Sequence, residues 1–258
     1  MIPALLLGRE GSVGFPGKNL YPILGRALME YPLIAALGAK KIDEVYVSTD
    51  SQRIKDIGAK HGAFIIDRPA YLCTKEALGE DAFVHGYMYI KDTMRRDVEL
   101  VVLLFCNAAT IMSYLIDEGI DILRSNPDYD SAVSVSRYNM WSPLRARKIA
   151  EDGLLHPFVP FETFGDPKTL NCDRDSQGDV WFADMGVSIV RPHCLENIND
   201  GLLPQKWMGQ RIYPLRQDAG CDVDFEWQIP GVENWLRVRG FTETSTPYEQ
   251  MVVRGGKT

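Results

Sequence analysis

The chain lacks any apolar run long enough to cross a membrane. A transmembrane helix needs ~20 consecutive apolar residues, whereas the apolar run at the N-terminus ends at Leu7 and no later run approaches that length. The N-terminus also has no basic stretch ahead of an apolar segment, which is the pattern of a secretory leader. We therefore expect neither membrane insertion nor secretion.

An excess of basic residues is also missing. Lys and Arg number 28 against 35 Asp and Glu, which gives a formal net charge of −7. Proteins that bind nucleic acid or anionic membranes usually carry a basic surface. The composition therefore argues against both kinds of partner, and an anionic small molecule would need locally placed basic residues.

Paired cysteines are absent as well. The five cysteines are odd in number, widely scattered and never spaced as Cys-x-x-Cys. Such usage indicates neither a disulfide framework nor a zinc site, and a reduced cytoplasmic setting fits best. The cysteines are Cys73, Cys106, Cys172, Cys194 and Cys221.

Short apolar runs that alternate with helical patterns are what the chain does contain. With 258 residues and 45% hydrophobic content it can bury a sizeable core. The alternation is typical of parallel βαβ units. We expect strands at residues 2–7, 44–48, 63–66 and 99–105. Helical spacing of apolar residues predicts helices at residues 31–41, 51–61, 80–96 and 112–125.

The pattern changes between about residues 140 and 182. Prolines, aromatic residues and little regular periodicity indicate an inserted arm there. Regular patterns then return, with a strand expected at residues 184–191. A closing helix is expected at residues 224–238, interrupted by Pro230 and Gly231.

The stretch REGSVGFPGKN, residues 9–19, directly follows the first strand and is the strongest functional motif. Its glycines allow backbone N–H groups to approach an anion and form a nest, while Arg9 and Lys18 supply positive charge. It matches neither the P-loop nor the Rossmann pattern, and a glycine-rich turn without a ligand is also common at such a place. The residues expected at a bound phosphate chain are Gly8, Arg9, Gly11, Ser12, Lys18 and Asn19.

The order Arg-x-x-Ser-x-Gly-x-Pro-x-Lys-Asn in this stretch resembles the signature of the sialic-acid-type cytidylyltransferases, the CMP-acylneuraminate synthetases and their relatives. The resemblance implies that the loop holds the CTP phosphates and that Arg9 and Lys18 stabilise the pyrophosphate leaving group. It extends over most of the chain, since the order of strands and helices is similar. It implies a single domain over residues 1–258 with a three-layer α/β, Rossmann-like nucleotidyltransferase fold, a mainly parallel central sheet and an inserted arm that pairs two subunits.

Two further segments resemble nucleotide-binding parts of the family. DRPAYL, residues 67–72, is similar to an Arg-Pro-x-x-Leu segment and makes Arg68 a nucleotide-binding candidate, although an ordinary surface arginine fits the sequence too. VSTDS, residues 47–51, is read more simply as a helix cap. LFCNAAT, residues 104–110, departs from the family pattern because Phe105 replaces a glutamine, and Asn107 is then the candidate polar contact.

The acceptor site rests on two arginines. SPLRARKI resembles a segment whose basic residue contacts the acid substrate, which makes Arg145 a candidate. CDRDSQGDVWFADMG resembles a degenerate form of a second family motif, and Arg174 takes the place of its arginine. A guanidinium suits a carboxylate, a phosphate or a phosphonate equally, so this pair predicts an anionic acceptor without identifying it.

Two aspartates near the C-terminus are candidate metal ligands. In GCDVDFEW, Asp222 and Asp224 are two residues apart, and on an extended strand they would share one face. Mg²⁺ is typically held by one or two carboxylates together with substrate phosphate oxygens, although a solvated acidic turn has the same composition. The family carries an Asp-x-Asp metal pair before its last helix. An alternative register would make Asp218 the outer ligand.

These observations predict a CTP-dependent cytidylyltransferase that requires Mg²⁺ and works as a homodimer. The leading acceptor is a 2-keto-3-deoxy sugar acid of the nonulosonate kind, activated for a surface glycan. The replacement of the family glutamine by Phe105 keeps a small phosphonate or another acidic metabolite open. It also keeps open a noncatalytic nucleotide-binding homologue.

Overall fold

A seven-stranded sheet in the order β11-β7-β10-β6-β1-β4-β5 forms the centre of the computed structural model, which describes residues 1–11, 14–171, 173 and 178–248. Only β10 is antiparallel to its neighbours, whereas the other adjacent pairs are parallel. The prediction of a mainly parallel sheet is therefore confirmed. The strands are β1 (Pro3–Leu7), β4 (Glu44–Thr49), β5 (Phe64–Asp67), β6 (Val101–Phe105), β7 (Ser131–Arg137), β10 (Trp181–Val190) and β11 (Ile212–Gln217).

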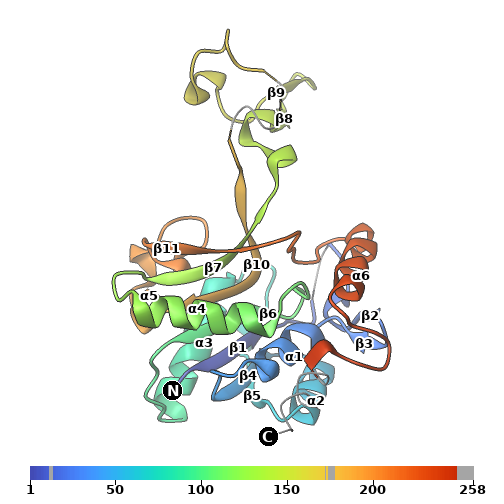
Figure 1. The fold of residues 1–258 in the computed structure, drawn as a ribbon, viewed down its shortest axis with the longest axis vertical. Helices are drawn as coiled ribbons and strands as arrows, with labels where there is room; N and C mark the ends of the chain where they lie inside the picture. The colour runs from blue at the N-terminus through green and yellow to red at the C-terminus, as the bar shows by residue number, and fades with distance from the viewer. Residues whose placement is uncertain (12–13, 172, 174–177, 249–258) are drawn as a thin grey trace, which may run out of the picture.

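Helices cover both faces of this sheet (Figure 1). Successive side chains of a strand point to opposite faces, so Ala4 and Leu6 pack with one group of helices and Leu5 and Leu7 with the other. On the first face lie α1 (Glu30–Gly38), α2 (Gln52–Lys60) and α4 (Ser113–Ser125); on the second lie α3 (Gly79–Met88) and α5 (Pro192–Glu196). The predicted three-layer α/β fold is confirmed.

The last helix begins later than the sequence predicts. Helix α6 spans Ile229–Val238, and Pro230 lies in its first turn, where its missing N–H has no helical partner to lose. The predicted interruption at this proline is therefore wrong. Helix α6 packs on the short hairpin of β2 (Pro22–Ile23) and β3 (Arg26–Ala27) through a third apolar cluster.

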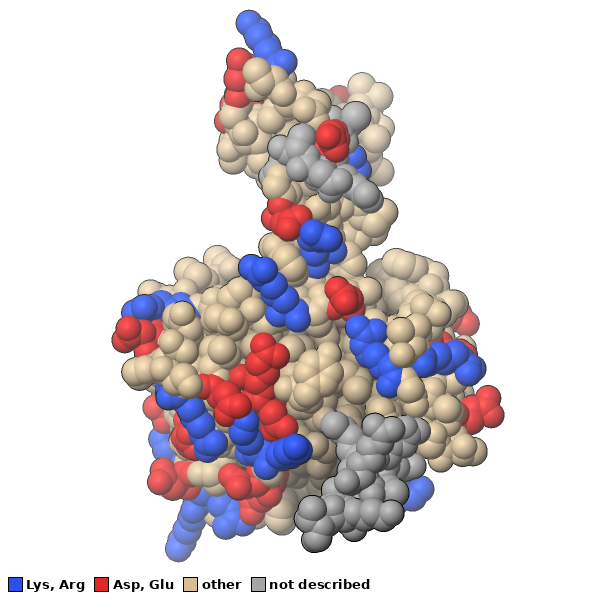
Figure 2. All heavy atoms as spheres, viewed as in Figure 1, with Lys and Arg blue, Asp and Glu red and all other residues tan. Residues whose placement is uncertain are grey.

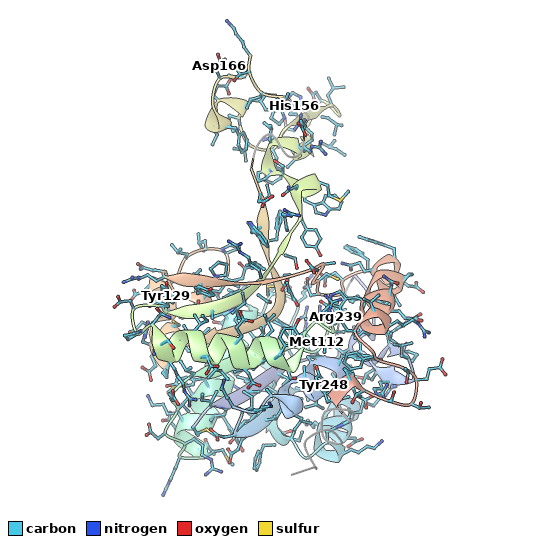
Figure 3. The ribbon with its side chains drawn as sticks, viewed as in Figure 1. Met112, Tyr129, His156, Asp166, Arg239 and Tyr248 are labelled. Carbon is cyan, nitrogen blue, oxygen red and sulfur yellow. The ribbon has the colours of Figure 1, made fainter. Side chains whose placement is uncertain are left out.

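The segment between β7 and β10 projects away from the sheet as an arm, defined here as residues 138–180 (Figure 1). It contains a two-stranded sheet of β8 (Arg147–Ile149) and β9 (Leu155–Pro157). Figure 2 shows the arm as a lobe on a narrow neck, and His156 and Asp166 lie in this lobe, far from the central sheet (Figure 3). Its exposed apolar side chains are Met140, Trp141, Ile149, Leu154, Leu155, Phe158 and Phe164.

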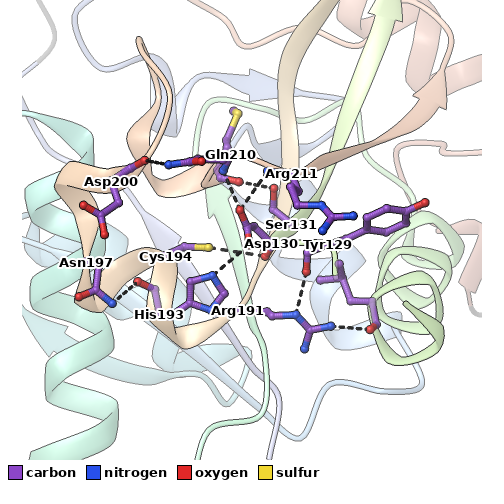
Figure 4. A network of polar contacts seen from close by, with 12 residues as sticks. Tyr129, Asp130, Ser131, Arg191, His193, Cys194, Asn197, Asp200, Gln210 and Arg211 are labelled. Carbon is purple, nitrogen blue, oxygen red and sulfur yellow. Dashed lines mark hydrogen bonds and ion pairs between the residues drawn. The ribbon is translucent and has the colours of Figure 1, made fainter. Parts of the chain in front are cut away.

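A network centred on Asp130 ties together the first residues of β7 and β11 and helix α5 (Figure 4). Asp130 Oδ2 accepts the backbone N–H groups of Gln210 and Arg211 at 2.8 and 2.9 Å, and Oδ1 lies 3.1 Å from His193 Nε2. Burial raises the pKa of Asp130, but the donors of Arg211, Gln210 and His193 outweigh it and hold this pKa below its ordinary value. The charged form therefore stabilises the fold.

We expect Asp130→Ala to lower the free energy of unfolding by about 1–3 kcal/mol at pH 7, because two backbone donors lose their acceptor. Since the folded pKa lies below the unfolded value of about 3.9, this stabilisation is present above that value and is lost as the pH falls through the folded pKa. Urea unfolding at pH 7 and near pH 3 should show the difference from wild type shrinking at the lower pH. Asp128→Ala is the control, because Asp128 makes only a long contact of 3.8 Å with Arg211; an equal loss in both variants would contradict the assignment.

Candidate active site

A cavity of about 240 Å³ lies at the carboxyl ends of the parallel strands β1 and β6. Ligands of open α/β sheets bind at this edge. One wall comes from the loop after β1, another from the residues after β6, and a third from the start of α3. The lining residues are Leu7, Gly8, Arg9, Lys18, Asn19, Arg68, Leu72, Ala77, Leu78, Gly79, Ala82, Phe105 and Asn107.

The loop of residues 9–19 is built around close backbone approaches. A Cβ at Gly8 would come within 2.7 Å of the Cys106 sulfur, so the chain can pass there only as glycine. Gly17 has φ +74° and precedes the turn of 3₁₀ helix at Lys18–Leu20. Asp50 fixes the start of the loop, because its Oδ1 accepts the N–H of Glu10 at 3.0 Å. Asp50 therefore orients the loop, whereas the expected side-chain cap of α2 is not formed.

Three cations line this cavity from separate elements. Lys18 forms an ion pair with Asp224, and Arg9 donates to the carbonyl oxygens of Thr74 and Cys73. Arg68 is 8% exposed and donates to Ser48, and burial lowers the pKa of its guanidinium. A buried cation beside a polar cavity favours an anionic ligand.

Asn19 offers an unused acceptor at the same cavity. It is 8% exposed, and its Nδ2 donates to the Arg9 carbonyl at 3.0 Å. Its Oδ1 is buried without a hydrogen-bond partner. Because buried polar atoms are nearly always paired, this oxygen is suited to a donor group of a bound ligand.

Other predicted loop residues lie elsewhere. Gly11 is exposed and does not line the cavity, while Ser12 lies outside the described residues. Gly14 packs closely on the backbone of Asp224, since a Cβ there would come within 3.0 Å of the Asp224 carbonyl oxygen. The loop therefore contacts the segment that carries the candidate metal ligands.

Asp222 and Asp224 lie beside the phosphate loop. Burial, and then the charge of Asp224, raise the pKa of Asp222, while Lys18 and a hydrogen bond from Asn107 oppose this rise. Asn107 also donates to the Val223 carbonyl at 3.0 Å. Asp218 is exposed, and its backbone oxygen accepts from Trp235 at 2.8 Å. The carboxylates that contact or influence Lys18 are therefore those of Asp222 and Asp224, and their role as metal ligands stays a prediction.

These two carboxylates fit a hard cation. They are oxygen donors two residues apart, and the charge of Asp224 helps to raise the pKa of Asp222; carboxylate oxygens are the donors that Mg²⁺ prefers. Within the described ranges no cluster of three His, Cys, Asp or Glu side chains could hold a metal ion. Phosphate oxygens of a substrate would therefore have to complete the coordination.

A second cavity, of about 570 Å³, is lined mainly by aromatic and small side chains. Asp222 lines this second cavity and interacts with Lys18 and Asn107, which line the first. No lysine or arginine lines it among the residues that the structure describes. The sequence did not indicate this cavity, because its walls come from β10, the base of the arm and α6. Its lining residues are Tyr138, Trp141, Phe182, Ala183, Asp184, Ala219, Gly220, Cys221, Asp222, Trp227, Gln228, Gly231 and Val232.

Arg145, one of the two predicted acceptor arginines, does not line the second cavity within one chain. It lines a different cavity, of about 350 Å³, formed entirely by arm residues such as Arg147 and Phe161. The arm to which it belongs projects away from the sheet (Figure 1). Arg174, the other predicted arginine, lies outside the described residues. A contact of Arg145 with the acceptor stays a prediction.

Phe105 and Cys106 at the end of β6 have apolar surroundings. Phe105 lines the first cavity and packs edge-on against Phe83 and Trp207, with ring centroids 5.0 and 6.0 Å away. Cys106 is fully buried, and this burial raises the pKa of its thiol to about 12. A thiol with such a pKa is a packing group and not a nucleophile.

Comparisons with known proteins agree with this geometry. A sequence model of the family described as cytidylyltransferase matches residues 3–132. The N-acylneuraminate cytidylyltransferase of Escherichia coli O18:K1:H7 is 29% identical over 138 residues, which are 54% of this chain and 32% of that protein. The enzyme of the same name from Oncorhynchus mykiss is 24% identical over 88% of this chain and 49% of its own length. The chain thus spans less than half the length of these curated relatives.

Solved structures support the fold. A CMP:2-keto-3-deoxy-manno-octonic acid synthetase complexed with CTP superimposes with a TM-score of 0.64 at 16% identity, covering 92% of this chain and 98% of that one. A 4-diphosphocytidyl-2C-methyl-D-erythritol synthase from Anaerococcus prevotii gives 0.59 at 14% identity, over 92% and 96%. At these identities the superpositions establish the shared architecture.

Proposed function

Because the chain belongs to the cytidylyltransferase family, we propose that it transfers CMP from CTP to an acceptor and releases pyrophosphate. The observation that carries this proposal is the cavity at the strand ends, which Arg9, Lys18 and Arg68 line together with the glycine-rich loop. The match to N-acylneuraminate cytidylyltransferases confirms the resemblance seen in residues 9–19.

The reaction places few chemical demands on the protein. An acceptor oxygen attacks the α-phosphorus of CTP, the bond from this phosphorus to the bridging oxygen breaks, and pyrophosphate leaves. Catalysis of such transfers is largely positioning and electrostatic stabilisation. Lys18 and Arg9 offset the negative charge that develops on the leaving group, and the buried Arg68 and Asn19 also contact the nucleotide.

Asp222 and Asp224 would hold Mg²⁺ at the entrance to the same cavity. When bound, this ion supplies positive charge to the phosphate oxygens and orients them. Asn107 fixes the segment between the two carboxylates, because it bonds to Val223 from both its side chain and its backbone oxygen. Lys18 offsets part of the negative charge of this pair.

The acceptor occupies the second cavity, which Asp222 lines. We infer that it is a 2-keto-3-deoxy sugar acid of the nonulosonate kind, and the names of the curated relatives support this class. Ligand cavities are usually lined by aromatic groups with a few polar groups that orient the ligand. Tyr138, Phe182 and Trp227 provide the apolar walls here.

Pyrophosphate release tests the function. The protein is incubated with Mg²⁺ and each of the four nucleoside triphosphates, against a panel of sugar acids and small phosphonates. Release with CTP and a sugar acid is the expected result. Release confined to a phosphonate would overturn the acceptor class, whereas CTP binding with no release across the panel would favour a noncatalytic homologue.

The protein is also proposed to act as a homodimer joined through the arm. Large exposed apolar patches on a protein surface usually mark an interface, and Ile149 and Leu155 are 77% and 70% exposed on this lobe. The family resemblance implies the same role for the arm. A second copy would also be positioned to bring Arg145 toward an acceptor site that has no described lysine or arginine of its own.

Light scattering should give twice the mass of one chain. Leu155→Asp should shift the protein toward the monomer, because a charge at an apolar interface is costly. The matched control is Leu202→Asp, at a leucine that is 52% exposed on the body of the protein. A wild-type mass equal to one chain would contradict the dimer.

A further inference from the structure

Asp184 in β10 carries a buried carboxylate that has no role in the proposed reaction. It is 5% exposed and accepts hydrogen bonds from three other places in the sheet. Oδ1 accepts from Ser134 at 2.5 Å and from the N–H of Gly186 at 3.1 Å, while Oδ2 accepts from Ser136 at 2.6 Å and from Gln217 at 2.9 Å. With both oxygens doubly bonded, Asp184 has little capacity left for a ligand.

Ser134 and Ser136 each donate to Asp184 and also accept one backbone N–H, and these two N–H groups belong to different segments. Both lie on β7 and are fully buried. The Oγ of Ser134 accepts the N–H of Val187, inside β10, at 2.9 Å. The Oγ of Ser136 accepts the N–H of Gly220 at 2.8 Å. Of the two serines, only Ser136 therefore connects the buried carboxylate to the backbone of Gly220, two residues before Asp222.

The backbone around this connection is tightly constrained. A Cβ at Gly220 would overlap the Asp184 carboxylate and the Gln217 amide. Its neighbour Ala219 has φ +52°, and Met185, next to Asp184, has φ +61°. Non-glycine residues persist in such left-handed conformations only where their surroundings enforce them, and they cluster at functional sites.

Residues 221–225, which include Asp222 and Asp224, are held by partners that do not contact Asp184. Thr110 exchanges hydrogen bonds with the backbone of Cys221, and Gln228 accepts the N–H groups of Asp224 and Phe225 at 2.7 and 2.8 Å. Tyr138 donates to the Gly220 carbonyl at 2.7 Å. The N–H of Gly220, by contrast, is fixed through Ser136.

We propose that Ser136, fixed in turn by Asp184, is a positioning residue that sets the approach of Asp222 and Asp224 to the metal–nucleotide complex. Groups that orient metal ligands from outside the coordination shell typically change metal affinity by about 10–100-fold when they are removed. The inference rests on the proposed function in one respect, namely that Mg²⁺ joins CTP at these two aspartates.

Ser136→Ala and Ser134→Ala form a matched pair for the test. Each substitution removes one hydroxyl that donates to Asp184 and accepts one backbone N–H. CTP binding is measured by calorimetry in Mg²⁺ and in EDTA, and thermal unfolding is recorded for both variants. We expect Mg²⁺ to increase the CTP affinity of Ser136→Ala about tenfold less than it increases that of wild type. In EDTA the CTP affinity of Ser136→Ala should equal that of wild type. Ser134→Ala should keep the full enhancement.

Equal Mg²⁺ enhancement in the two variants would overturn the positioning role, and so would a Ser136→Ala loss that appears equally in EDTA. If Mg²⁺ left the CTP affinity of the wild type unchanged, the metal assignment itself would fail and the inference with it. Pyrophosphate release by the wild type is scored separately. A failure of the proposed transfer activity is thereby distinguished from a failure of the role of Ser136.

Discussion

Lys18→Ala should lower kcat by about 100-fold or more at saturating CTP, since the loss of one preorganised group that stabilises transition-state charge typically costs this much. Lys18 lines the nucleotide cavity and is the lysine of the phosphate loop. The fold should be little affected, because among the described residues the side chain of Lys18 forms its ion pair with the carboxylate of Asp224, which is 55% exposed, and ion pairs that solvent reaches contribute about 0–1 kcal/mol. Pyrophosphate release and thermal unfolding measure the two quantities.

Lys41→Ala is the matched control for this substitution. Lys41 forms a comparable ion pair with the exposed Asp121. This pair joins the residues after α1 to α4 and does not line the nucleotide cavity. Its removal should change neither kcat nor the affinity for CTP. Equal turnover in Lys18→Ala and wild type would remove Lys18 from the catalytic machinery.

Asp222→Asn should shift the Mg²⁺ dependence of turnover to higher concentrations by at least about tenfold. Loss of a ligating carboxylate should cost no less than the 10–100-fold typical of groups outside the coordination shell. Asp222 is the more buried carboxylate of the pair, and its raised pKa reflects both this burial and the charge of Asp224. A bound cation would relieve this repulsion, so removal of one charge weakens the binding of the cation. Mg²⁺ titrations of pyrophosphate release measure the shift.

The control is Asp218→Asn, which also tests the alternative register of the sequence motif. Asp218 is exposed and is held through its backbone oxygen by Trp235, so its side chain can change without moving the segment. The Mg²⁺ midpoint of this variant should equal that of wild type. A shift in Asp218→Asn combined with an unchanged Asp222→Asn would reverse the assignment of the ligands.

The strongly apolar strands of the central sheet could be predicted from the sequence, whereas two of its strands, β7 and β11, could not. The strand β7, SAVSVSR, alternates small apolar residues with serines that are buried and hydrogen-bonded in the structure. Such serines lower the local hydrophobicity, so their pairing with Asp184 becomes visible only in three dimensions. The strand β11 contains Pro214, which lacks the N–H that would donate to a neighbouring strand and so weakens the strand pattern. It lies at the edge of the sheet, where a proline is tolerated.

The site divides in a similar way. The phosphate loop could be recognised because its glycines and cations are consecutive in the sequence, and the structure brings Arg9, Lys18 and Asn19 to one cavity with Arg68 and Asn107. The proposed acceptor site could not be predicted, because the second cavity combines residues from the base of the arm, β10 and α6. Arg145 was matched by its local motif alone, and local sequence does not reveal that the arm carries it outward from the sheet.

A crystal structure of the protein with CTP and Mg²⁺ would show where the nucleotide and the ion bind. We expect the triphosphate to follow residues 8–19, with a phosphate oxygen at Lys18 and the ion held by Asp222 and Asp224. We also expect the aromatic cavity beside Asp222 to stay open toward the α-phosphorus. A nucleotide bound with its phosphates away from Lys18, or with its base in the aromatic cavity, would disprove this binding mode.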